Sequence, residues 1–519
     1  MDNKNYGRRD FLKFLGLSVY STNFIASQSL AFSNKPKSLF PSSVDQLTLH
    51  PQLKSSVLIK WEDKISAKDT FGFNNDYNAF IPLSKDRGIL WTNHEYINPI
   101  FLHGSRPEKS EKTKEQVELE MYNVGGSLVE LKKNKDKTWS VVQNSKYNRR
   151  VTGLTDIPFA ANVQVKGAKS AMGTLANCAG GVTPWGTVLT CEENYDSFYG
   201  DRDSKSKKIK SSRYFWDKYF QNPPEHYGWV VEVDPRTGKS KKHTSLGRYM
   251  HEAAAVTTDK NKTVCYSGDD KANEFIYKFI SDKKDSLDKG TLHVANVEEG
   301  KWLPLDLEQS PILKKHFKTQ VDVLTYCREA GRILGATPMN RPEDIEIHPK
   351  TNEVFICLSN NAKKLDFHGS ILKISEDKND PLKFKSETFL MGGKTLSCPD
   401  NIVFDSRGNL YVATDISGRR IGKYPYTDFE NNGLFVVPAE GANAGQVIQI
   451  ASAPNDAEFT GVYFSEDEET LFMSVQHPGE LSKSASSPTS HWPSGSKSEI
   501  PRPAVVQLQG KAFQNVDLF

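Results

Sequence analysis

A short unit recurs along this 519-residue chain and constrains its fold more than any other feature. Each copy contains an acidic residue, a short apolar strand, a polar turn and a second apolar strand that ends in polar residues. Four copies align readily, at residues 252–270, 343–359, 400–415 and 458–476. Two more copies fit when the first residue is allowed to vary, at residues 178–193 and 76–95. Short alternating apolar runs of this kind predict β-strands rather than helices.

The number and length of these units predict the architecture. Repeated hairpins that cannot bury their faces alone are typical of β-propellers, in which the blades close into a ring. The repeat therefore predicts an all-β chain that folds as a six-bladed β-propeller with long inter-strand insertions. We expect the insertions at residues 200–225 and 282–338, and we expect residues 32–519 to form this single domain.

The N-terminus carries a pattern that is typical of an export signal. Arg8 and Arg9 precede a modest apolar run, residues 14–20, and a segment of small residues around Ala31. This arrangement resembles a twin-arginine signal peptide. We predict that residues 1–31 are this signal and that the twin-arginine (Tat) export machinery is a partner. The mature protein is then expected outside the cytoplasm, in the periplasm or the extracellular space. The alternative is a basic amphipathic helix that belongs to the fold.

Overall charge and cysteine content exclude other classes of protein. The 67 Lys and Arg residues nearly balance the 64 Asp and Glu residues, which leaves a net charge of +3. Such a small excess does not favour nucleic acid as the main partner. Six cysteines are too few for a disulfide scaffold in a chain of this length. We expect a monomer whose function depends on a local site.

The repeat itself predicts where that site lies. The first strand of each propeller blade lines the central channel, so the residues that open the six repeats converge at one mouth. These residues are Asp76, Cys178, Glu252, Glu343, Asp400 and Glu458. Five carboxylates and a thiol gathered without partners would repel one another and lose hydration, and bound cations would resolve this conflict. The alternative is that these acids cap strand ends and face solvent.

The second strands end in further potential ligands, and the ligand types suggest which metals bind. The polar residues at these ends are His94, Glu95, Glu192, Glu193, Asp269, Asp270, Asn360, Asp415 and His477. Carboxylate oxygens suit Ca²⁺, whereas a thiolate suits a transition metal such as iron or zinc. The repeat positions hold few histidines, so iron is favoured over zinc. A simpler alternative is that Cys178 packs in the channel without a ligand role.

One long motif and several shorter ones resemble a known family. The stretch NCAGGVTPWGTVLTCEEN, residues 177–194, resembles the hallmark motif of the PhoX-type alkaline phosphatases. Shorter family blocks follow in the same order, at residues 248–253, 267–270, 274–279, 341–344 and 398–401. The resemblance covers nearly the whole mature chain, although the chain is rather short for the family.

The resemblance implies a function, cofactors and site residues. It implies a secreted enzyme that hydrolyses small-molecule phosphomonoesters and releases phosphate, with a cluster of Fe³⁺ and Ca²⁺ ions joined by a bridging oxo or hydroxo group. Cys178 is implied as the thiolate on iron and Arg341 as the residue that faces the phosphate, and these two are the predicted catalytic residues. The implied metal ligands are Glu95, Cys178, Glu193, Glu252, Glu274, Glu343, Asp400 and Glu458.

Two other functions fit a propeller with an acidic channel. A calcium-only hydrolase of the lactonase or phytase type also places acids around a central ion, but it has no need for the thiol of Cys178. A non-catalytic exported binding propeller would have apolar or scattered polar residues at the positions that open the repeats, unlike this chain.

Overall fold

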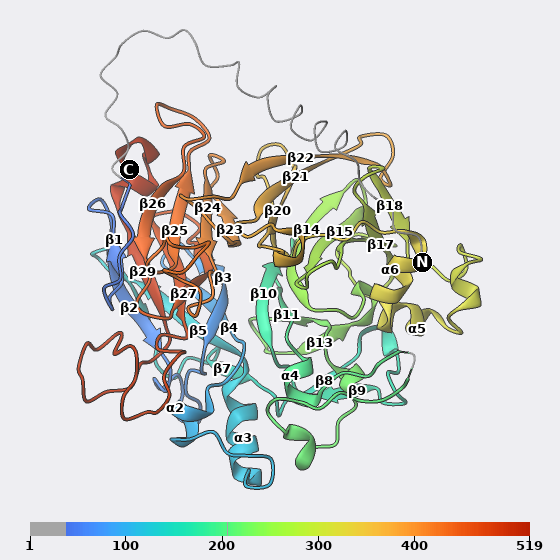
Figure 1. The fold of residues 1–519 in the computed structure, drawn as a ribbon, viewed down its shortest axis with the longest axis horizontal. Helices are drawn as coiled ribbons and strands as arrows, with labels where there is room; N and C mark the ends of the chain where they lie inside the picture. Colours follow the sequence, from blue (N-terminus) through green and yellow to red (C-terminus); the bar gives the residue numbers. More distant parts are fainter. Residues whose placement is uncertain (1–37, 205) are drawn as a thin grey trace. The chain divides into compact units, whose positions relative to one another are not determined.

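The computed structural model describes residues 38–204 and 206–519 (Figure 1). The predicted signal peptide, residues 1–31, lies outside this range, so its assignment stays a prediction. Within the described range, no helix is long and apolar enough to cross a membrane.

The first three blades are antiparallel sheets whose strands follow one another along the chain. The first contains β3 (Asn75–Ser84), β4 (Arg87–His94), β5 (Gly125–Lys133) and β6 (Trp139–Val141), with β7 (Arg149–Val151) also paired to β5. The second contains β10 (Asn177–Val182), β11 (Val188–Glu192), β12 (Val230–Val233) and β13 (Ser240–His243). The third contains β14 (His251–Asp259), β15 (Lys262–Asp269), β16 (Ile276–Ser281), β17 (Gly290–Asn296) and β18 (Lys301–Pro304).

The last three blades repeat the same pattern, and two of them also use the start of the described chain. The fourth contains β19 (Pro342–Ile347), β20 (Val354–Leu358), β21 (Ser370–Glu376) and β22 (Phe384–Met391). The fifth contains β23 (Pro399–Phe404), β24 (Leu410–Thr414), β25 (Gly433–Val437) and β26 (Ile448–Ser452), completed by β1 (Thr48–Leu49). The sixth contains β27 (Glu458–Phe464), β28 (Thr470–Gln476) and β29 (Ala504–Gln509), completed by β2 (Lys54–Lys60).

These six sheets close into a ring. Each innermost strand packs against the innermost strands of both neighbouring blades, in the order β3, β10, β14, β19, β23 and β27, and β27 returns to β3. Because β1 and β2 come from the N-terminal side of the first blade, their pairing in the last two blades ties the ends of the propeller together. The prediction of an all-β, six-bladed propeller is confirmed for the described residues.

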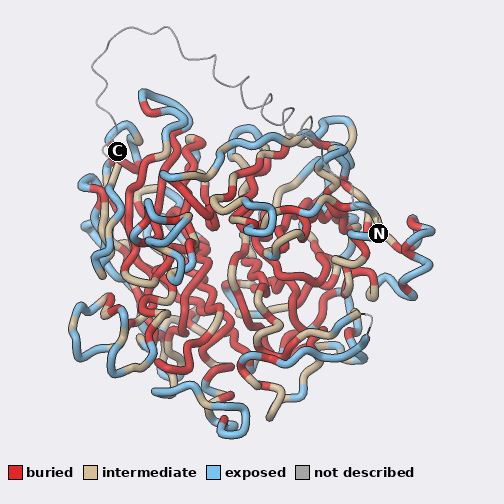
Figure 2. Tube along the Cα trace, viewed as in Figure 1, coloured by how far each residue is buried: buried red, intermediate tan, exposed pale blue. Residues whose placement is uncertain are grey.

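The hydrophobic core lies within and between the blades, whereas the loops that connect the strands are mostly exposed (Figure 2). One core cluster, for example, joins the fifth and sixth blades through Tyr411, Phe464 and Phe513. Each blade therefore buries its faces against its neighbours, as the physics of a repeat fold requires.

Helices occur in the segments that link strands. The helices α2 (Pro99–His103) and α3 (Lys114–Asn123) lie between β4 and β5, and α4 (Asp196–Tyr199) follows β11. The pair β8 (Asp156–Pro158) and β9 (Ser170–Met172) precedes the second blade, and α5 (Gln320–Thr325) and α6 (Cys327–Leu334) precede the fourth. The predicted insertion at 200–225 lies between β11 and β12. The insertion predicted at 282–338 is shorter in the structure, because its first part forms β17 and β18 of the third blade.

Candidate metal centre

The six residues that open the repeats line a single cavity of about 220 Å³. Five of them are the second residue of their innermost strand, and Glu458 is the first residue of β27. The antiparallel hairpins place the start of each first strand beside the end of its second strand, as the pairs Asn177 with Glu192 and His251 with Asp269 show. Residues that follow the second strands therefore reach the same cavity. Its carboxylates are those of Asp76, Glu95, Glu193, Glu252, Asp270, Glu343, Asp400, Asp415, Glu458 and Glu480.

The backbone enters most of these strands through the same kink. In five blades the residue two positions before the opening residue is left-handed although it is not glycine. These residues are Asn74 (φ 40°), Ala176 (φ 52°), Arg341 (φ 52°), Cys398 (φ 52°) and Asp456 (φ 60°). A left-handed conformation costs a non-glycine residue about 1–2 kcal/mol, and such strain clusters at functional sites.

Bulges follow the kinks in the innermost strands. In β3, β10, β19 and β23, the pairing register shifts across the opening residue itself, so Asp76, Cys178, Glu343 and Asp400 lie in bulges. Because a bulge leaves a residue out of the regular pairing, it can turn a side chain away from the alternating pattern of the strand. The kink and the bulge together position the opening side chains at the cavity.

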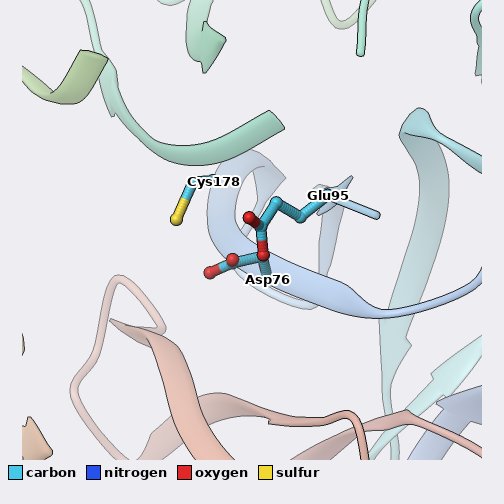
Figure 3. A group of neighbouring side chains, drawn as sticks. All are labelled: Asp76, Glu95 and Cys178. Atoms are coloured by element: carbon cyan, nitrogen blue, oxygen red, sulfur yellow. The ribbon is translucent and has the colours of Figure 1, made fainter. Parts of the chain in front are cut away.

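Cys178 lies at the centre of two groups of potential ligands. Its sulfur lies within 4.8 Å of ligand atoms of Asp76 and Glu95, and likewise within 4.8 Å of ligand atoms of Glu193 and Glu252. Figure 3 shows the Asp76 and Glu95 carboxylates of the first blade lying together, with the Cys178 side chain of the second blade beside them. Both burial and the nearby carboxylates raise the pKa of the Cys178 thiol. A thiol among carboxylates in this setting requires a cation to become a thiolate.

Most carboxylates of the cavity lack a cationic partner among the described residues. Burial raises the pKa of seven of them above the usual range, namely Asp76, Glu95, Glu193, Glu252, Glu343, Asp400 and Glu458. Neighbouring carboxylates raise the pKa of Asp400 and Glu458 further. Asp76 Oδ1 and Glu252 Oε2 are buried without a hydrogen-bond partner among the described residues. The donor set and its unsatisfied oxygen atoms therefore fit several bound cations.

Arg341 is the one arginine or lysine among the described residues that line the cavity. Its Nε and Nη2 atoms lie 2.7 and 2.8 Å from the two carboxylate oxygens of Asp270, and Nη2 also lies 2.7 Å from Glu343 Oε1. Burial tends to raise the pKa of Asp270, but the guanidinium charge outweighs burial and holds that pKa below its usual value. Two carboxylates therefore fix the orientation of the Arg341 side chain.

At the ends of the second strands, adjacent residues point in opposite directions. Glu193 and Asp270 face the cavity, whereas their predecessors Glu192 and Asp269 turn into the protein and pair with cations. The buried Lys242 Nζ lies 2.6 Å from Glu192 Oε1. Among the paired polar residues that the repeat predicted, the second residue of each pair thus faces the cavity. The first residue supports the blade, because successive side chains of a strand alternate between its faces.

Glu274 is the implied ligand that the structure does not bring into this group. After Asp270 the chain turns, Glu274 N donates to Lys271 O, and the Glu274 carboxylate pairs with Arg332 of α6. Asn360 likewise does not line the cavity, and its amide lies 3.5 Å from the sulfur of Cys398. The remaining implied ligands and Arg341 all line the cavity.

The resemblance did not imply Asp270, Asp415 or Glu480 as metal ligands, although all three line the cavity. The signal for Asp270 and Asp415 was present, because each directly follows a second strand, as Glu95 and Glu193 do. Glu480 comes from the segment after β28, outside the repeat, so no sequence signal marks it.

Comparison with known proteins places the chain in a family. A family model described as alkaline phosphatase PhoX matches residues 35–479. The chain belongs to the PhoX alkaline phosphatase family. The structure of Pseudomonas fluorescens PhoX, solved in complex with vanadate as a transition state analogue, matches with 29% identity and a TM-score of 0.81. That match covers 92% of this chain and 98% of the Pseudomonas chain. As a member of the family, the chain is a phosphatase.

Other solved structures match this chain with lower sequence identity and lower TM-scores. A protein of unknown function from Dyadobacter fermentans matches with 12% identity and a TM-score of 0.43, covering 89% of this chain and 100% of that one. A gluconolactonase from Xanthomonas campestris matches with 10% identity and a TM-score of 0.34, covering 92% and 98%. A comparison with curated protein sequences finds no match.

The raised pKa values predict how stability depends on pH once the metals are removed. A carboxyl whose pKa is raised by folding keeps a proton that the unfolded chain releases, so stability falls as the pH rises above about 4, the ordinary carboxyl pKa. Each such group lowers the free energy of unfolding by about 1.4 kcal/mol per pH unit, until the pH passes the pKa of the group in the folded protein. We expect chelator-treated protein to melt at a lower temperature at pH 8 than at pH 5. The variant with Asp76→Asn and Glu252→Gln should show a smaller difference, and equal melting temperatures at both pH values in the parent protein would contradict the prediction.

Proposed function

We propose that this enzyme hydrolyses phosphomonoesters with a cluster of Fe³⁺ and Ca²⁺ ions held in the cavity at the mouth of the propeller. The observation that carries the proposal is the position of Cys178, whose sulfur belongs to two groups of carboxylate ligands. The vanadate complex of Pseudomonas fluorescens PhoX supports phosphoryl transfer as the reaction, since vanadate acts there as a transition state analogue. A calcium-only centre would give the thiol no role.

Ligand chemistry favours a different metal in different parts of the cavity. Cys178 with Glu193 and Glu252 combines one thiolate with carboxylates, a set that suits iron. Oxygen-only neighbours such as Asp400, Asp415 and Glu458 suit Ca²⁺, which accepts six to eight oxygen ligands in loose geometry. Bound cations of this kind neutralise the negative charge that spreads over a transferring phosphoryl group and activate water for attack.

Arg341 supplies the donor for the substrate. Its Nε and Nη2 atoms are taken by Asp270 and Glu343, which leaves Nη1 without a hydrogen-bond partner among the described residues. A guanidinium fixed by two carboxylates loses little rotamer freedom when a phosphate oxygen binds, because its orientation is already set. Arg341 would therefore bind and orient the phosphoryl group.

The thiol of Cys178 should determine the iron content of the enzyme. We expect Cys178→Ala to lower the iron content per chain and to reduce phosphatase activity by about 10³-fold or more, because the thiolate is lost from the ligand set. Elemental analysis and hydrolysis of p-nitrophenyl phosphate measure the two effects. Cys191→Ala is the matched control, since Cys191 lies on the adjacent strand β11 and packs into the core. A Cys178→Ala enzyme with full activity would exclude the iron-thiolate site, and calcium without iron in the parent protein would favour a calcium-only hydrolase.

Arg341 should contribute directly to substrate turnover. Replacement by Ala should lower kcat/KM for p-nitrophenyl phosphate by about 10²-fold, because a donor to the charged phosphate is removed from a shielded site. Arg341→Lys should restore part of the loss. Arg87→Ala is a suitable control, because Arg87 pairs with Glu130 at the opposite end of β4. If kcat/KM is unchanged in Arg341→Ala, Arg341 does not contact the substrate.

The predicted signal peptide should determine where the enzyme is located in the cell. We propose that the twin-arginine route exports the folded enzyme to the periplasm or the extracellular space, on the basis of Arg8 and Arg9 in the predicted signal peptide, residues 1–31. Replacing both with Lys should retain the protein in the cytoplasm, because the charge is kept but the arginine pair is lost. Cell fractionation and immunoblotting measure the distribution. The charge-preserving change of Lys4 and Lys13 to Arg should leave export intact, and export of the Arg8→Lys, Arg9→Lys variant would refute the proposal.

A further inference from the structure

A second cavity, of about 410 Å³, lies next to the candidate metal centre. In contrast to the acidic cavity, its lining holds twice as many cationic as acidic side chains. The cationic residues are Arg202, Lys210, Arg248, Lys271, Arg328 and Arg332, and the acidic residues are Asp201, Asp203 and Glu329. We refer to it as the basic pocket.

The wall between the two cavities is short. Asp270 lines the acidic cavity and the next residue, Lys271, lines the basic pocket. In the same way, Asn194 lines the acidic cavity and Tyr195 lines the basic pocket. Because consecutive Cα atoms are about 3.8 Å apart, two chain segments pass directly from one cavity to the other. Along these two segments, adjacent residues therefore line the two different cavities.

Two arginines of the basic pocket, both on α6, are held in place by acids outside its lining. Arg328 and Arg332 are four residues apart on α6 and so share one face of this helix. Arg328 pairs through Nε and Nη2 with the buried Asp269, and Arg332 pairs with Glu274. The Nη1 atoms of both arginines have no hydrogen-bond partner among the described residues. Glu274, implied by the resemblance as a metal ligand, thus fixes a residue of this pocket.

The lysines add free positive charge. Lys210 and Lys271 are exposed, and neither Nζ atom makes an ion pair or a hydrogen bond with another described residue. Lys210 belongs to the strongly basic part of the insertion, residues 202–213, where Lys207 and Lys208 also lie. Positively charged side chains of this kind attract anions and raise the anion concentration near the pocket.

We propose that the basic pocket binds a second phosphoryl group of the same substrate, so that the enzyme prefers phosphate esters that carry two phosphates. The inference rests on the proposed phosphatase activity of the neighbouring cavity. Fixed guanidinium groups match the planar, multidentate acceptor pattern of a phosphoryl group, and the lysines supply further charge. The two cavities are adjacent, so the reacting phosphate and the second phosphate can be bound at the same time.

A ladder of α,ω-alkanediol substrates tests the proposal. The monophosphates and bisphosphates of propane-1,3-diol and hexane-1,6-diol differ within each pair by one phosphoryl group, and the two lengths sample a shorter and a longer separation of the two phosphates. We expect kcat/KM of the full metal-loaded enzyme to favour the bisphosphate by about tenfold at one length or both. Two equivalent phosphates alone give a statistical factor of two. In the variant with Lys210→Ala and Lys271→Ala, the preference should fall toward that factor while p-nitrophenyl phosphate is hydrolysed as before.

The control variant carries Lys85→Ala and Lys260→Ala. Both lysines are exposed, in the turns between β3 and β4 and between β14 and β15, at the ends of these hairpins away from the metal centre. It should keep the preference, and Lys210→Arg with Lys271→Arg should restore it. A parent enzyme that hydrolyses p-nitrophenyl phosphate but shows only the statistical factor overturns the inference and leaves the phosphatase intact. Equal losses for monophosphates and bisphosphates in the Lys210 and Lys271 variant also overturn it, because they indicate general attraction of anions. Failure to hydrolyse p-nitrophenyl phosphate would instead refute the proposed function itself.

Discussion

The concentration of negative charge at one end of the propeller is the constraint on which the rest of this structure depends. Ten carboxylates line a cavity of about 220 Å³, and Arg341 is the one arginine or lysine that the described chain places among them. Burial raises the pKa of most of these carboxyls. Without cations, the protein must therefore keep some of them protonated or be destabilised by repulsion between carboxylates. The closed ring cannot relieve this by moving the strands apart, because every innermost strand packs against two others. Cations are therefore part of what makes the folded ring favourable.

The backbone provides this charge cluster through local devices that the blades repeat. A left-handed residue two positions before the opening residue occurs in five blades, and bulges hold Asp76, Cys178, Glu343 and Asp400. These features cost conformational energy and remove regular pairing, so the rest of each blade must compensate. The paired acids at the ends of β11 and β15 show how compensation is built in. Glu192 forms an ion pair with Lys242, and Asp269 forms one with Arg328. Glu193 and Asp270, the residues that follow them, line the cavity instead.

Much of this arrangement could be predicted from the sequence, because the repeat has a fixed phase. The residue that opens a first strand and the residue after a second strand occupy equivalent positions in every blade, so Asp76, Glu252 and Asp400 could be selected without any structure. Glu274 and Glu480 show where this reasoning fails, because both lie where the chain leaves the repeat. Glu274 follows a turn after β15 and pairs with Arg332, and Glu480 reaches the cavity from a segment outside the hairpins. No periodic signal reports the direction of such side chains.

The sequence by itself determined the all-β propeller, the count of six blades and the convergence of their opening residues, since these follow from a repeated pattern of apolar and acidic positions. It also singled out Cys178 by its chemistry. Tertiary structure alone decided that Asp270 holds Arg341 in the cavity and that α6 places Arg328 and Arg332 beside it. These contacts join segments about 60 to 70 residues apart in the chain, and their geometry depends on how an insertion packs against a blade. Local sequence carries no record of that packing, because the contacting residues lie far apart in the chain.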